Sequence, residues 1–276
     1  MISIPIAVAI DYFKPQISFF QFQHLEVYKD KAQEMAFIPI IKYNHFNEPA
    51  VEDVDWHMKL PYKMVNSVYD YIDSDKQWHI PINVFTAAKQ IIETLNDDDV
   101  VEIMDADLVH LKPHPEYYDH LPYDVVIADA TYEDWHMHIS KPDSQNRMVI
   151  SDYLTHRDEG YMNGGFNVIG RVKTIKGIID DVILYSKLVT EKEKGNQHSW
   201  WCAMHGLNIA CHNHKIKMID GGNCYYPNVN TLKEQHYLAH YSCDPMFDKH
   251  KILNLNTNQF PNNLFYNQAK KWISQL

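Results

Sequence analysis

Two aspartates separated by a single alanine, Asp105-Ala106-Asp107, directly follow the largely apolar run of residues 100–104. Because side chains alternate along an extended strand, residues two positions apart project to the same side. Two carboxylates held close together repel each other, and a hard divalent cation between them relieves that repulsion. Such a cation, with coordination positions left open, can bind a diphosphate and neutralise a leaving nucleotide. A polar turn after a strand is the alternative interpretation, but the apolar run and the helix predicted before it favour a metal site.

A pair of glycines, Gly164 and Gly165, follows Asn163 and precedes the apolar run of residues 166–169. Glycine allows positive φ and a close approach of the backbone to a ligand. The pattern indicates either a tight turn that leads into a strand or a loop that contacts a ligand.

Two adjacent tryptophans, Trp200 and Trp201, stand at the start of a predicted helix. Aromatic faces stack on sugars and on nucleobases. We therefore expect one tryptophan to line an acceptor cleft and the other to pack in the core.

These residues must be positioned by an alternation of strands and helices. Strands are predicted at residues 4–10, 100–104, 124–128, 166–169 and 215–219, and helices at residues 18–35, 83–95, 172–189 and 200–211. This order predicts an α/β sandwich with a mostly parallel central sheet flanked by helices. In such a sheet ligands bind beyond the carboxyl ends of the strands, where Asp105 and Asp107 would lie. Without a visible repeat or linker, we expect one domain, with a nucleotide-binding half at about residues 1–110 and an acceptor half at about 111–276.

Composition and charge narrow the class of protein. The chain has 276 residues, 45% of them hydrophobic, which is typical of a folded globular protein. Lys and Arg total 25 against 36 Asp and Glu, a net charge of −11. Long-range attraction to nucleic acid is therefore not expected, although a local basic strip could still bind it.

The cysteines and the N-terminal segment exclude further classes. Cys202, Cys211, Cys224 and Cys243 show no CxxC spacing, which argues against a zinc ribbon and favours reduced thiols, with disulfides as the alternative. The apolar residues 1–10 are too few to span a bilayer, and no basic segment precedes them. We expect a soluble cytoplasmic protein without a membrane partner, in the host cytoplasm if the chain is viral.

Taken in order, these motifs resemble the GT-A glycosyltransferases, whose hallmark is a strand that ends in an Asp-x-Asp metal motif. More narrowly, the chain is similar to the hydroxyproline O-arabinosyltransferase and peptidyl-serine galactosyltransferase group. The matching blocks are short and scattered: Ile80-Pro81, residues 102–108, Lys112-Pro113, Gly164-Gly165, Trp201 with Met204, Tyr226-Pro227 and His240-Tyr241.

The resemblance implies a UDP-sugar donor, Mn²⁺ (or Mg²⁺) as cofactor and retention of the anomeric configuration. It also implies that His240 is the third metal ligand beside the two aspartates, with His236 as a competing candidate. Imidazole suits Mn²⁺ better than it suits Mg²⁺.

The remaining donor-side residues are also assigned by resemblance. Ala106 and the glycine pair would contact the donor, and Asn163 would contact the sugar or the acceptor. Asp11 and Tyr12, expected to end the first strand, would receive the nucleobase, by analogy with the fold.

The chain departs from the group at Ala203, where the resemblance predicts an acidic residue just before Met204. This departure leaves the catalytic residue unassigned. Asp180 and Asp181 are possible substitutes, but their helical setting favours solvated surface charges.

Three function classes follow. The first is transfer of a pentose such as arabinose, or of a hexose, to a hydroxyl of a protein, glycan, small molecule or hydroxymethylated cytosine in DNA, the last as in phage enzymes. The second is a nucleotidyltransferase, although no Gly-rich phosphate loop with a following Lys is visible. The third is a non-catalytic nucleotide-sugar-binding protein of the same fold, for which Ala203 is the best argument.

Overall fold

A computed structural model of the chain describes thirteen stretches of it: residues 1–6, 10–29, 38–42, 59, 62–66, 80–105, 108–128, 149–155, 167–193, 201–221, 224–225, 231–240 and 264–276. Its helices and strands are, in chain order, β1 (Ile2–Ile6), α1 (Ile10–Tyr28), β2 (Ile38–Lys42), β3 (Tyr62–Asn66), α3 (Ile80–Ile92), β4 (Val100–Asp105), β5 (Leu108–His110), η3 (Glu116–His120), β6 (Val125–Ala128), η5 (Ser151–Tyr153), β7 (Val168–Arg171), α5 (Val172–Lys192), α7 (Cys202–Asn213), β8 (Lys217–Asp220), β9 (Cys224–Tyr225), β10 (Leu238–His240) and α8 (Leu264–Ile273).

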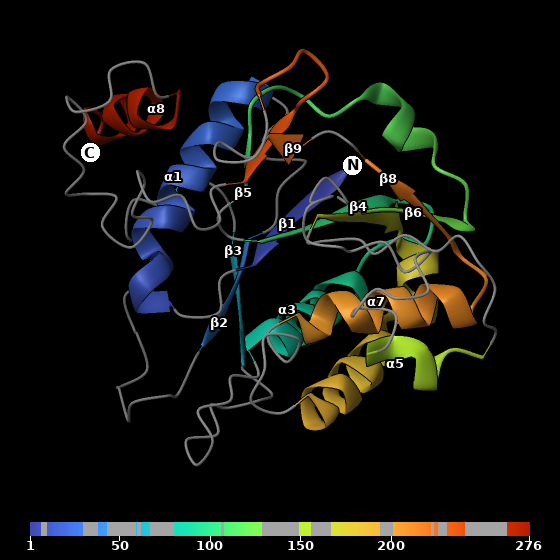
Figure 1. The fold of residues 1–276 in the computed structure, drawn as a ribbon. Coiled ribbons are helices and arrows are strands. Elements are labelled where there is room, and N and C mark those ends of the chain that lie inside the picture. Colours follow the sequence, from blue (N-terminus) through green and yellow to red (C-terminus); the bar gives the residue numbers. More distant parts are fainter. Residues whose placement is uncertain are drawn as a thin grey trace.

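A five-stranded sheet with the order β1-β4-β7-β6-β8 forms the centre of the fold (Figure 1). β1 pairs with β4, and β6 with β8, in parallel, whereas β7 is antiparallel to both of its neighbours. Four strands therefore share one direction and β7 alone opposes them. The predicted α/β sandwich with a mostly parallel sheet is confirmed, and the sheet is mixed.

Strand β4 is buried on both faces because its two sets of alternating side chains enter two different cores. Val101 and Ile103 pack with α3, α5 and α7 on one face. Val100 and Met104 pack with α1 and the segments beyond it on the other face. A strand covered on both faces reads as a nearly continuous apolar run, which is why the sequence indicated it clearly.

Each face of the sheet carries its own layer (Figure 1). Helices α3, α5 and α7 lie together on one side. On the other side lie α1, α8 and a three-stranded sheet with the order β5-β10-β9. This second sheet carries His110 at the end of β5 and His240 at the end of β10, both of which are discussed below. None of the described helices has the length and apolar character needed to cross a membrane.

The first strand and first helix differ from the prediction. β1 ends at Ile6 rather than at residue 10, and α1 begins at Ile10 rather than at residue 18. A short continuous apolar run does not distinguish a strand from a buried helix, so the pattern extended the strand too far. Asp11 and Tyr12 therefore lie in the first turn of α1 and do not end the first strand.

Candidate functional site

The acidic motif begins at the carboxyl edge of the central sheet. Asp105 is the last residue of β4, where it pairs with Ile6, the last residue of β1. The five residues of β4 before Asp105 are buried, whereas Asp105 is partly exposed. The strand therefore delivers this carboxylate to the edge at which ligands bind in sheets of this kind. Ala106 and Asp107 lie outside the described residues.

His240 lies beside the same motif although it is far away in the sequence. It is the last residue of β10, which is antiparallel to β5, and its register partner is Leu108. Leu108 directly follows Asp107 in the chain. Asp105 and Leu108, the register partner of His240, are three residues apart in the chain, so two of the three predicted ligands come from neighbouring segments of the fold.

His236, the competing candidate, accepts a hydrogen bond from a residue close to it in the sequence. His236 is buried, and its Nδ1 accepts a hydrogen bond from the backbone N–H of Lys233 at 3.0 Å. Its ring also stacks on Tyr225, with the centroids 6.1 Å apart. His240 is the better placed of the two histidines because its register partner, Leu108, directly follows Asp107.

The predicted ligand set fits a borderline divalent cation. Two carboxylates and one imidazole supply oxygen and nitrogen donors, which suit Mn²⁺. Within the described stretches, no group of three or more His, Cys, Asp or Glu side chains could hold a metal ion. Since Asp107 is outside those stretches, the complete set stays a prediction.

A buried carboxylate that sequence reasoning did not single out lies behind the metal motif. Glu102 is fully buried in β4, on the face opposite Val101 and Ile103. Its Oε2 accepts hydrogen bonds from Ser3 Oγ at 2.8 Å and from His110 Nε2 at 3.0 Å. A charged residue inside an apolar strand was the signal for this cluster, since such a group is rarely buried without partners.

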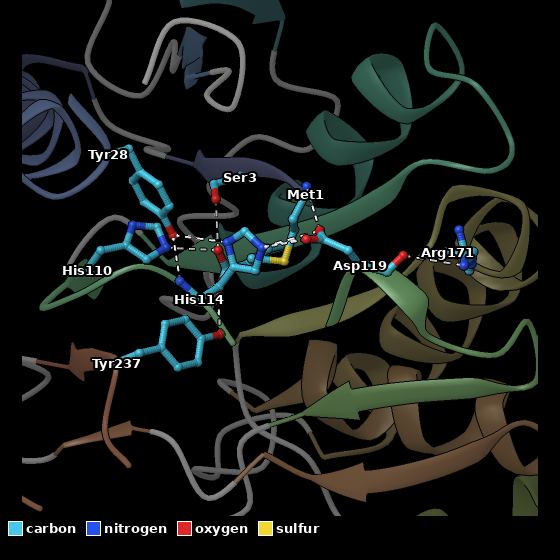
Figure 2. A network of polar contacts seen from close by, with 9 residues as sticks. Met1, Ser3, Tyr28, His110, His114, Asp119, Arg171 and Tyr237 are labelled. Carbon is cyan, nitrogen blue, oxygen red and sulfur yellow. Dashed lines mark hydrogen bonds and ion pairs between the residues drawn. The ribbon is translucent and has the colours of Figure 1, made fainter. Parts of the chain in front are cut away.

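The third partner of Glu102 comes from the other end of the chain. Its Oε1 accepts a hydrogen bond from Tyr237 Oη at 2.9 Å. Figure 2 shows Ser3, His110 and Tyr237 converging from three separate segments. Both carboxylate oxygens are therefore used, by donors from β1, from β5 and from the residue before β10.

Electrostatics around this carboxylate favour its charged form. Burial pushes the pKa of Glu102 upward, but the charge of His110 and the hydrogen bonds from His110, Ser3 and Tyr237 outweigh it and bring the pKa below its ordinary value. Burial, with Glu102 nearby, raises the pKa of Tyr237 well above its ordinary range. Tyr237 thus stays a hydroxyl donor to an ionised carboxylate.

A line of aromatic and imidazole side chains continues from His110 to the surface. His24 Nδ1 lies 3.4 Å from His110 Nδ1, and burial, followed by His110 and His114, lowers the pKa of His24 to about 2. Tyr28 Oη lies 3.3 Å from His114 Nδ1, and His114 Nε2 lies 3.3 Å from the Asp119 carboxylate (Figure 2). Burial lowers the pKa of His114, with Asp119 opposing the shift.

The segment after the glycine pair joins this cluster. Gly164, Gly165 and Asn163 are outside the described residues, but Asn167 is buried and donates through Nδ2 to Tyr237 Oη at 3.3 Å. Its φ of 123° is unusual for a residue with a side chain. Such backbone conformations persist only where the surroundings enforce them.

The start of α7 carries Ala203 and follows the two tryptophans that the sequence assigned to the site. Trp201 precedes the helix and is half-buried, and Trp200 is outside the described residues. Ala203 is fully buried in the core with α3 and α5, so a carboxylate there would lack solvent. The absence of an acidic residue at this position is thus consistent with its apolar packing.

The two substitute carboxylates are surface groups. Asp180 is exposed and pairs with Lys89 Nζ at 2.6 Å, and Asp181 pairs with His214 Nε2 at 2.6 Å. The first pair joins α5 to α3, and the second joins α5 to the residue that follows α7. Both aspartates are therefore surface charges, as their helical setting in the sequence indicated. The described residues therefore give no catalytic carboxylate on α5 or α7.

Three of the four cysteines lie in the interior of the fold. Cys202, Cys211 and Cys224 are buried, and Cys243 is outside the described residues. Burial raises the pKa of Cys202 to about 11 and that of Cys211 to about 12. Both are therefore unreactive thiols that pack in the interior.

Comparison with known proteins places the fold. No protein-family model and no curated protein sequence matches the chain. The galactosyltransferase LgtC, solved in complex with donor and acceptor sugar analogues, superposes with a TM-score of 0.61 at 12% identity, covering 100% of this chain and 96% of that one. An active-site mutant of LgtC gives a TM-score of 0.60 at 11% identity, with the same coverage. The chain thus has the GT-A fold that the sequence indicated, whereas the narrower resemblance to the arabinosyl- and peptidyl-serine galactosyltransferase group stays a prediction.

Proposed function

We propose that this protein is a glycosyltransferase that moves a sugar from a UDP-sugar to a hydroxyl acceptor with retention of configuration at the anomeric carbon. Mn²⁺ (or Mg²⁺) is the cofactor in this proposal. Asp105, Asp107 and His240 hold the cation. The sugar is a pentose such as arabinose or a hexose, and the acceptor is a protein, a glycan or modified DNA.

One observation carries the proposal: the pairing of His240 with Leu108 beside the acidic motif. A hydrophobic strand followed by two carboxylates supports only a cation site. An imidazole brought to that motif by a separate strand, within a GT-A fold, adds the donor type that distinguishes Mn²⁺ from a purely oxygen-ligated ion.

The bound cation would supply positive charge that stabilises the diphosphate leaving group. The residues of the chain have the task of holding that charge and orienting the donor. Asp105 presents its carboxylate at the sheet edge, and residues 164–165 supply backbone that can approach the donor closely. Asp11 and Tyr12, in the first turn of α1, are proposed to meet the nucleobase, and Trp201 the acceptor.

A second candidate is a nucleotide-sugar-binding protein without turnover. The buried Ala203 supports it, because the core position leaves no carboxylate where the resemblance predicts one. This candidate requires the same metal and donor site, so donor binding is common to both, and turnover separates them.

The test is a thermal-denaturation screen of the whole protein against nucleotide sugars, with and without Mn²⁺. A ligand that binds only the folded state raises the melting temperature by mass action. We expect a rise with uridine sugars that needs Mn²⁺ and disappears when the metal is chelated. A screen in which no nucleotide sugar raises the melting temperature would contradict the proposal.

Turnover is then measured on the donor that binds. Release of UDP with transfer of the sugar to water or to an added acceptor supports the transferase, and NMR of the product reports the anomeric configuration. Metal-dependent binding without UDP release supports the second candidate. Release of pyrophosphate without sugar transfer would instead indicate a nucleotidyltransferase.

A further inference from the structure

We propose that Glu102 is a positioning residue, which holds the segments of the metal and donor site in register through a buried hydrogen-bond cluster. The inference rests on the proposed function, because the segments concerned are those assigned to metal and donor binding. The cluster consists of Glu102, Ser3, His110, Tyr237 and Asn167.

Each partner of Glu102 stands next to a segment assigned to the site. Glu102 itself lies in β4, three residues before Asp105. His110, which donates to its Oε2, ends β5, the strand that begins directly after Asp107. Tyr237, which donates to its Oε1, lies three residues before His240. A single carboxylate thereby joins the strand that enters the acidic motif, the strand that leaves it and the segment that brings the third predicted ligand.

The cluster also reaches the glycine loop. Tyr237 Oη accepts a hydrogen bond from Asn167 Nδ2 at 3.3 Å while it donates to Glu102. Asn167 follows Gly165 by two residues and has a φ of 123°. The chain that leaves the loop is therefore fixed to the same carboxylate through one tyrosine.

The chemistry of a carboxylate explains why this residue type suits the task. An ionised carboxylate only accepts hydrogen bonds, so three donors from different segments can point at it together. Burying such a charge is costly, and well-packed apolar residues of similar size often give equal or greater stability. The charge is therefore better explained by the geometry that it imposes than by the stability that it adds.

The expected loss of metal affinity follows from what is known of residues that contact metal ligands without contacting the metal. Groups that orient metal ligands typically change metal affinity or activity about 10–100-fold when they are altered. In Glu102→Gln the side chain keeps its size, but its amide group places a donor where a partner now donates. We expect the dissociation constant of Mn²⁺, measured by electron paramagnetic resonance in the presence of UDP, to rise about 10–100-fold.

Two further variants separate positioning from general stability. Tyr237→Phe removes one hydroxyl and keeps the carboxylate and the ring, and we expect a smaller rise in the same dissociation constant. Ser186→Ala removes a buried hydrogen bond, Ser186 Oγ to the Val182 carbonyl, from α5 in the other layer. We expect this control to lower the urea midpoint without changing Mn²⁺ affinity.

The outcomes distinguish this inference from the proposed function. Wild-type protein that does not bind Mn²⁺ with UDP overturns both. If the wild type binds and Glu102→Gln keeps the same dissociation constant within about twofold, the positioning role alone is overturned. If Glu102→Gln fails to fold, the same comparison is made with Tyr237→Phe, and an unchanged dissociation constant for Mn²⁺ in that variant overturns the positioning role. A rise in both variants, with Ser186→Ala unchanged, supports the role of Glu102.

Discussion

His240 and Leu108 are register partners in the antiparallel ladder between β10 and β5, so the end of β10 lies beside the acidic motif. The two strands are short, three residues each. Their pairing is the link between a motif near the middle of the sequence and a histidine far beyond it. The first two predictions test whether that link forms a metal site.

Removing either aspartate should abolish the response to metal. In Asp105→Ala or Asp107→Ala the cation loses one of its two carboxylate ligands and the site loses a negative charge. We expect Mn²⁺-dependent binding of UDP, measured by calorimetry, to disappear while circular dichroism shows an intact fold. Wild-type binding in either variant contradicts the metal site.

The two neighbouring histidines form a matched pair. His240→Ala should weaken Mn²⁺ binding about 10-fold or more, since an imidazole ligand is lost. His236→Ala should leave it unchanged, because His236 Nδ1 accepts from the Lys233 backbone N–H, which places the proton of the neutral ring on Nε2 and leaves no nitrogen lone pair for a metal. Equal effects in both variants would show that the assignment of the ligand to His240 is wrong.

The central layers were predictable from the sequence because burial on two faces or on one helical stripe leaves a strong pattern. β4, β6, α3, α5 and α7 all lie within a few residues of their predicted bounds. β5, β9 and β10 were not predicted, because strands of two or three residues carry too little alternation to be recognised.

The site was predictable in part for the same reason. Asp105 was predicted because a clearly apolar strand precedes it. His240 was assigned only by resemblance, because its position beside Leu108 depends on pairing between strands that are far apart in the sequence. Glu102 was visible as a charge within an apolar run, but its partners come from three distant segments. No local pattern reports such partners.

Gly206 should be intolerant of a side chain. A Cβ there would lie 2.8 Å from the Ser186 backbone nitrogen, and closer still to Ser186 Oγ and the Val182 carbonyl. Helices α5 and α7 would have to separate, so we expect Gly206→Ala to lower the free energy of unfolding by about 1–3 kcal/mol in urea titrations.

Gly177 gives the matched control, because it lies within α5 and a Cβ there meets nothing within 4 Å. Alanine favours the helix over glycine, so Gly177→Ala should raise the free energy of unfolding by about 0.5–1 kcal/mol. A destabilised Gly177→Ala, or an unchanged Gly206→Ala, would contradict the helix packing.

Acid should destabilise the protein through His24. Its pKa lies near 2 in the folded protein, mainly because of burial, against an ordinary value of 6.5. Below about pH 6.5 the unfolded chain therefore binds a proton that the folded protein does not, and acidification favours unfolding. For this one group the free energy of unfolding falls by about 1.4 kcal/mol between about pH 7.5 and about pH 5.5.

His114 and Glu102, whose pKa values are also shifted, do not reverse this sign. The pKa of His114 is also lowered, chiefly by burial, so it acts in the same direction and over the same range. The pKa of Glu102 is lowered too, but a carboxylate titrates below about pH 4.5 in the unfolded chain, outside this window. His24→Phe keeps a ring against Tyr28 and removes the titration, so urea titrations at the two pH values should show a smaller difference than in the wild type. Wild-type stability that stays constant or increases on acidification would mean that His24 is not buried as a neutral imidazole.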